Sequence, residues 1–235
     1  MNILKTTLMA SVAFAAAAMT TTAQAEESGF LGGEVSANIS MVNDYRFRGV
    51  SLSDKDFALQ GGLDYAHESG FYVGGWASSL ASSNAYGELE VDLYAGYAGE
   101  IEGISFDIGG LLYAFPTGDH SAQTDYFEAY ASVGVDLGIA SATVGLAYAF
   151  SNDGTGNEDN IYLYTDVEGA IPDTPVTVKA HLGYEDGAFG DKKLDWSLGA
   201  SVSYSNLDFG ISYVDTDQAG RNFDAAVIFS IGASF

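Results

Sequence analysis

Apolar and polar residues alternate along most of the chain. In residues 88–98 the odd-numbered positions are mostly apolar, whereas the even-numbered positions include Glu88, Glu90 and Asp92. Residues 176–185 and 194–204 show the same period of two, which is typical of half-buried β-strands. No useful stretch after residue 25 has the 3.6-residue period of an amphipathic helix. The pattern therefore predicts an all-β chain.

The same alternation predicts about twelve strands. They begin near residues 34, 57, 70, 88, 103, 125, 140, 160, 174, 194, 206 and 223. The intervals between successive starts are alternately long and short, as expected when antiparallel strands are joined by long loops at one end and short turns at the other. Short turns are expected at 67–70, 172–175 and 205–206, and long loops at 44–56, 79–87, 116–124, 151–160, 185–193 and 215–222.

Alternation alone does not say which face of the sheet looks inward. The polar face is mostly Ser, Gly and carboxylate with little Lys, unlike the mixed charges of a soluble surface. Aromatic residues lie close to the predicted strand ends, as in interfacial girdles: Tyr45, Phe47, Phe71, Tyr97, Tyr126, Phe127, Tyr148, Phe150, Tyr184 and Tyr213. The last strand ends on Phe235, and this terminal aromatic resembles a sorting signal for outer-membrane assembly. We therefore expect a closed transmembrane antiparallel β-barrel with short periplasmic turns and longer extracellular loops.

The first 25 residues resemble a secretory signal peptide. Lys5 precedes an apolar run over residues 8–19, and Ala23-Gln24-Ala25 provides a small-x-small cleavage site. We expect removal of residues 1–25, leaving residues 26–235 as a single outer-membrane domain.

The charge balance excludes one class of partner. The chain has 8 basic and 32 acidic residues, a net charge of −24, and no cysteine. Nucleic-acid binding needs a basic surface for the phosphates, so it is not expected. The expected partners are outer-membrane lipid and lipopolysaccharide, the barrel-assembly machinery, and small solutes or ions.

The segment Asn43-Asp44-Tyr45-Arg46-Phe47-Arg48-Gly49-Val50-Ser51 resembles a motif of the TorF family, whose members are regarded as porins. Residues 58–65, 70–78, 88–97 and 213–217 also fit, so the resemblance covers most of the predicted mature chain. It implies an outer-membrane barrel that forms a pore, with no settled substrate and no catalytic residues.

Strand direction and alternation predict a set of lumen-facing residues. Arg46 and Arg48 are expected on strand one near the outer end, opposite Glu88, Glu90 and Asp92. The candidate pore-lining residues are Arg46, Arg48, Asp64, Glu88, Glu90, Asp92, Glu128, Asp166, Lys179, His181 and Asp195. Two interpretations remain open: a charged constriction that acts on passing ions, or ion pairs that staple the barrel. Small lumen residues are expected to leave room for water, at Gly62, Gly96, Gly109, Gly145, Gly183 and Gly199.

These observations favour a passive pore for small solutes or ions, with a preference for cations because the wall is acidic. The alternatives are a non-conducting structural or adhesive barrel, and an outer-membrane lipid hydrolase. The hydrolase is disfavoured because the three histidines are scattered along the chain, with His67 in a predicted short turn, His120 in a long loop and His181 on a lumen face. The acidic segment 152–159 lacks the spacing of a helix–loop–helix Ca²⁺ loop, and no cofactor or metal is expected.

Overall fold

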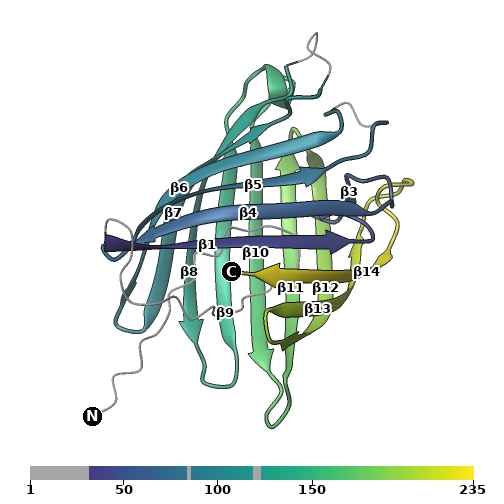
Figure 1. The fold of residues 1–235 in the computed structure, drawn as a ribbon. Coiled ribbons are helices and arrows are strands. Elements are labelled where there is room, and N and C mark those ends of the chain that lie inside the picture. The colour runs from purple at the N-terminus through teal and green to yellow at the C-terminus, as the bar shows by residue number, and fades with distance from the viewer. Residues whose placement is uncertain (1–31, 84–85, 119–122) are drawn as a thin grey trace.

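The computed structural model describes residues 32–83, 86–118 and 123–235, which form one closed antiparallel barrel (Figure 1). The predicted fold of twelve strands is confirmed, whereas the predicted signal peptide lies outside the described residues. The barrel strands are β1 (Gly33–Val42), β4 (Ala58–His67), β5 (Phe71–Ser79), β6 (Leu89–Ile101), β7 (Ile104–Ala114), β8 (Tyr126–Asp136), β9 (Ser141–Ala149), β10 (Asn160–Ala170), β11 (Val176–Gly187), β12 (Gly190–Tyr204), β13 (Leu207–Thr216) and β14 (Ala226–Ser234). Each pairs with its neighbour in the chain, and β14 returns to β1.

The first and last strands close the sheet. Their register runs from Asn38 opposite Ser234 to Val42 opposite Ser230. Beyond the strand end, the backbones of Ala37 and Phe235 exchange two hydrogen bonds of 2.9 and 2.8 Å. The Phe235 side chain is exposed on the outside of the barrel. The terminal residue therefore contributes directly to closure, and its role as a sorting signal stays a prediction.

The two faces of the sheet are the reverse of those in a soluble barrel. Leu63 and Leu198 are each 59% exposed on the outer face, whereas Glu90 is 1% exposed and Asp92 is 0% exposed on the inner face. An outer wall of apolar side chains around a charged interior fits an apolar surrounding medium.

Among the residues that the structure describes, no helix is both long and apolar enough to span a bilayer.

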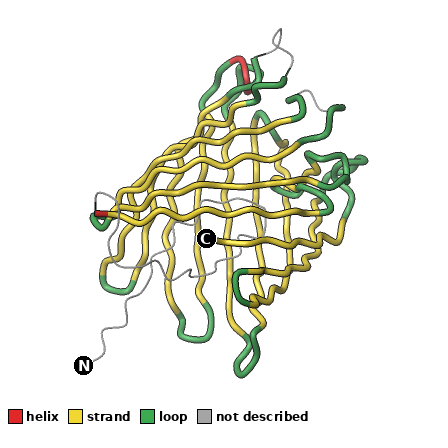
Figure 2. Tube along the Cα trace, in the orientation of Figure 1, coloured by secondary structure: helices red, strands yellow, loops and turns green. Residues whose placement is uncertain are grey.

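Connections at the two ends of the barrel differ in length (Figure 2). At one end the turns are tight: Glu102 and Gly103 join β6 to β7 with positive φ angles of 54° and 82°, as a two-residue hairpin requires. At the other end lie longer loops, including 43–57 and 217–225. The long loop expected at 185–193 is wrong, because β11 and β12 extend outward until only Ala188 and Phe189 connect them. An interval between two strand starts includes both the strand and the connection after it. Its length therefore cannot distinguish a long strand from a long loop.

The expected aromatic girdle is only partly present. Phe71 and Tyr97 are exposed at the turn end, with ring centroids 4.9 Å apart. Tyr45, Phe47 and Tyr126 instead pack inside the barrel. Tyr126 occupies the lumen face of β8, and the other two belong to a loop that folds inward.

The space above several lumen glycines is filled by tyrosine rings, not left for water as expected. Tyr72 pairs across strands with Gly96, and Tyr130 with Gly109. In both pairs the phenol lies where a Cβ on the glycine would be. The same arrangement occurs at Gly145 under Tyr164 and at Gly183 under Tyr162. The glycines thus let the rings lie against the wall.

Single-cysteine labelling tests the orientation of the wall without background, because the chain has no native cysteine. Cysteines at Leu198 and Val227, which are 59% and 46% exposed, should react only with lipid-phase reagents. A cysteine at Ser197, which is half-buried on the inner face, should react only with water-soluble reagents small enough to enter the lumen. The opposite labelling pattern would show that the faces are inverted.

Candidate functional site in the lumen

The loop over residues 43–57 folds into the barrel and forms a small hairpin of its own. Its strands are β2 (Arg46–Phe47) and β3 (Val50–Ser51), with Arg48 and Gly49 at the turn. Both turn residues have positive φ, 48° and 83°, so a two-residue hairpin turn forms. A Cβ on Gly49 would lie 2.6 Å from Thr216 Cγ2, so only glycine fits against β13 at this point.

The carboxylate of Asp44 organises this hairpin. It accepts hydrogen bonds from Ser51 Oγ at 2.6 Å and from Arg46 Nε at 2.7 Å. Arg46 Nη1 also donates to the backbone carbonyls of Gly49, Asn222 and Asp224. Arg46 therefore shapes the hairpin and ties it to the loop before β14.

Arg48, at the tip of the hairpin, joins this loop to distant strands. Its guanidinium contacts Glu128 on β8 at 2.7 Å and Glu185 on β11 at 2.8 Å. It also lies 4.2 Å from the ring centroid of Tyr162 on β10. In the closed strand order β8 and β11 are separated from both β1 and β4 by several strands. The loop consequently reaches across the outer lumen.

A second cation completes the buried network. Lys193 Nζ on β12 lies 2.5 Å from Glu185 Oε2 and donates to the backbone carbonyl of Arg48 at 2.9 Å. Burial alone lowers the pKa of Arg48, but the carboxylates of Glu128 and Glu185 outweigh burial and hold it well above its ordinary value. Two cations and two carboxylates therefore balance in a region from which water is excluded.

The predicted placement of Arg46 and Arg48 on strand one is wrong. β1 ends at Val42, so both residues belong to the inserted loop. Arg48 pairs with Glu128 and Glu185, not with Glu88, Glu90 or Asp92 as expected. Glu88 lies exposed just before β6, where its backbone N–H donates to Thr117 Oγ1. It is therefore part of an outer loop and not of the lumen wall.

A further cluster of predicted residues surrounds His181. Its Nδ1 lies 2.9 Å from Asp166 and its Nε2 lies 3.2 Å from Asp195. Lys179 Nζ is 3.7 Å from Asp166, and Tyr162 Oη is 2.7 Å from the histidine. Together these residues link β10, β11 and β12.

Paired tyrosine and aspartate side chains line the opposite part of the wall. Asp64 accepts a hydrogen bond from Tyr94, and Asp107 accepts one of 2.6 Å from Tyr72. Asp64 was predicted on the wall, whereas Asp107 was missed. Sequence reasoning also missed the roles of Glu185 and Lys193, which it assigned to a loop. Glu185 lies two residues after Gly183, and Lys193 lies two residues before Asp195. The period of two could therefore have placed both on the lumen face.

One of the histidines lies beside a serine. His67 Nδ1 lies 2.7 Å from Ser69 Oγ, but the Ser69 backbone N–H donates to the same nitrogen, which makes this a local turn contact. His120 lies outside the described residues. Within residues 32–83, 86–118 and 123–235, no three His, Cys, Asp or Glu side chains are arranged to hold a metal ion.

Comparison with known proteins places this barrel in a family. The family model described as "Bacterial protein of unknown function (Gcw_chp)" matches residues 23–233. The chain belongs to this family. No curated protein matches the chain.

Solved structures with the same fold include porins. The chain aligns with a KdgM porin at 9% identity and a TM-score of 0.58, covering 86% of this chain and 97% of the porin. It aligns with a NanC porin at 11% identity and a TM-score of 0.58, covering 86% and 99%. An outer-membrane channel from Pseudomonas putida F1 aligns at 12% identity and a TM-score of 0.50, covering 92% and 99%. At these identities the likeness shows a shared porin-type barrel fold.

Replacing Arg48 with Gln tests the buried network. The substitution leaves Glu128 without its salt-bridge partner in a buried position, which costs about 3–5 kcal/mol of unfolding free energy. Arg221→Gln is the matched control, because the Arg221 side chain is 74% exposed and its pair with Asp54 should contribute less than about 1 kcal/mol. Urea unfolding of the refolded barrel in detergent measures both. Equal stability of the two variants would contradict the network.

Proposed function

We propose that this chain is a passive outer-membrane pore for small solutes or ions, with a preference for cations. The observation that carries the proposal is the inverted barrel, with an apolar outer wall and an interior lined by carboxylates. The shared fold of the porins supports it, and so does the resemblance of residues 43–51 to the TorF family. Outer-membrane insertion would follow removal of residues 1–25 and recognition of the C-terminal strand.

The inserted loop makes the outer lumen the narrowest part of this pore. Arg48 and Lys193 are held there by Glu128 and Glu185, so their charges are neutralised within the loop layer. Deeper in the barrel Asp64 is half-buried and Asp107 is buried, and both have tyrosine hydroxyls as partners. We infer that uncompensated carboxylates of the wall attract cations, and that the inserted loop sets the width of the lumen.

One observation favours a second candidate, a closed structural or adhesive barrel. Buried ion pairs fasten the loop over residues 43–57 to strands across the lumen, which would suit a permanent plug. Single-channel recording separates the two functions, because a permanent plug predicts no conductance at any voltage.

Reversal potentials measure the expected selectivity. In a KCl gradient across a planar bilayer, the wild-type barrel should pass K⁺ in preference to Cl⁻, because a wall rich in carboxylates raises the local cation concentration. The preference should weaken as salt rises from 0.1 to 1 M, since the screening length falls from ~10 to ~3 Å. Anion selectivity would contradict the proposed function.

Shortening the inserted loop tests its part in setting the width. Deleting residues 46–51 removes the hairpin tip from the lumen, so single-channel conductance should rise severalfold and cation preference should persist. Deleting residues 153–157, in the outer loop between β9 and β10, is the control and should leave conductance unchanged. An unchanged conductance after the first deletion would show that the constriction lies elsewhere.

A further inference from the structure

Two carboxylates beneath the inserted loop have no counter-charge in the structure. Glu90 and Asp92 alternate on β6, so both face the interior, and they are 1% and 0% exposed. Both oxygens of Asp92 and Oε2 of Glu90 are buried without a hydrogen-bond partner. A buried charge is expensive unless it is paired or coordinates a metal ion. These oxygens are therefore candidate ligands for a cation.

The nearby cations are already committed to other carboxylates. Arg48 and Lys193 balance Glu128 and Glu185, and Arg46 balances Asp44. Within the described part of the inserted-loop layer, this leaves the carboxyl groups of Glu90 and Asp92 without a paired cation. Both are close enough to interact, and Glu128 adds to the negative field at Asp92. One divalent cation would neutralise the pair.

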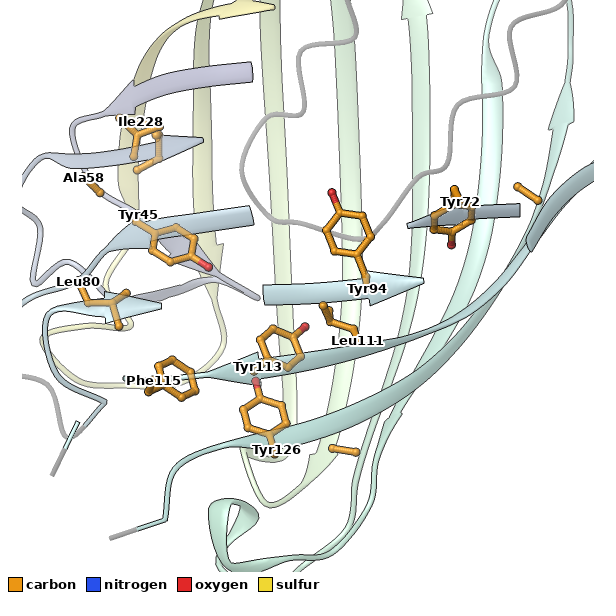
Figure 3. Packing of buried hydrophobic residues seen from close by; sticks show 13 residues of the cluster. Tyr45, Ala58, Tyr72, Leu80, Tyr94, Leu111, Tyr113, Phe115, Tyr126 and Ile228 are labelled. Atoms are coloured by element: carbon orange, nitrogen blue, oxygen red, sulfur yellow. The ribbon is translucent and has the colours of Figure 1, made fainter. Parts of the chain in front are cut away.

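Aromatic side chains enclose this place and bring the loop to it. Trp76 on β5 and Tyr113 on β7 are the cross-strand neighbours of Asp92. The Tyr45 hydroxyl, from the inserted loop, lies beside Glu90 and Asp92 and is buried without a hydrogen bond of normal geometry. Figure 3 shows Tyr45, Tyr94 and Tyr113 extending into the same interior region. The surrounding rings bury the carboxylate and phenol oxygens together.

We propose that Glu90 and Asp92 form a site for a hard divalent cation, which the Tyr45 hydroxyl completes from the inserted loop. Oxygen donors of this kind suit Ca²⁺, with carboxylates that bind through one or both oxygens. The site uses two carboxylates and a phenol, and so differs from centres built on three or more acidic or histidine ligands. Its occupant would join the loop to β6, on the side of the barrel that Arg48 does not reach. The proposal concerns binding, and it does not depend on whether the barrel conducts.

Thermal unfolding of the refolded barrel in detergent, at one fixed pH and ionic strength, tests the site. After treatment with EDTA, added CaCl₂ should raise the unfolding midpoint of the wild type by about 5 °C or more at a hundredfold excess over Kd. The double variant Glu90→Gln/Asp92→Asn should lose this response. Because it no longer buries two unpaired charges, it should fold and should unfold at a higher temperature than the wild type in EDTA.

Asp208→Asn is the matched control, because Asp208 is another lumen carboxylate, 1% exposed with one unpartnered oxygen, near the turn end of β13. This variant should keep the full Ca²⁺ response. Tb³⁺ gives a second readout, since Tyr45 and Trp76, with ring centroids 5.5 Å apart, should sensitise its luminescence at this site. The sensitised signal should disappear in the double variant and persist in Asp208→Asn.

Three results would overturn the proposal. No Ca²⁺ response of the wild type, with a more stable double variant, would mean that the two carboxyl groups share protons instead. An equal Ca²⁺ response in the wild type and the double variant would place the binding in the outer acidic loops. A response to NaCl as large as that to the same low concentration of CaCl₂ would exclude a site specific for divalent cations.

Discussion

The whole architecture depends on the satisfaction of backbone hydrogen bonds in a medium that offers none. A sheet surrounded by hydrocarbon cannot leave an edge strand unpaired, so β14 must return to β1. Closure then forces alternate side chains into two different environments. The apolar set faces outward, and many of the charges on the strands, such as those of Glu90, Glu128 and Asp195, face a confined interior. The remaining features of the structure are consequences of having to accommodate those charges.

Confined charges need partners. Adjacent strands supply some of them, as Lys193 does for Glu185, but Glu128 gains its counter-charge from Arg48, on a loop that spans the gap. Glu128 and Glu185 project from strands that do not adjoin each other. Arg48 reaches both because its hairpin enters the lumen from the β1–β4 connection. The turn at Arg48 and Gly49 is therefore needed to place the Arg48 guanidinium between these two carboxylates. The same loop brings Tyr45 over Glu90 and Asp92, so a single insertion organises both halves of the outer lumen.

The fold could be predicted from the sequence because each strand residue must suit the face of the sheet on which it lies. This requirement produces a period of two along every strand. Predicted strand starts lie within four residues of the observed ones, with the largest difference at β12, which begins at Gly190. The inserted loop could not be predicted in the same way. Residues 43–51 do alternate, and nothing in a local pattern distinguishes a wall strand from a hairpin that turns back into the lumen. Arg48 was recognised as a lumen residue, but its partners depend on the closed three-dimensional order of distant strands.

The tyrosine–glycine pairs show how the barrel can be filled at its wall and still contain a passage. A tyrosine that pointed at the axis would obstruct a twelve-stranded barrel, whereas one that lies over a glycine of the next strand adds only the thickness of its ring. Its hydroxyl then reaches a wall carboxylate, as Tyr72 does with Asp107. The wall below the loop is in this way lined by neutral hydroxyls and acceptors at fixed positions. In a pore of the proposed kind the inserted loop would therefore set the width of the lumen and the wall its polarity, so the two properties could be changed independently of each other.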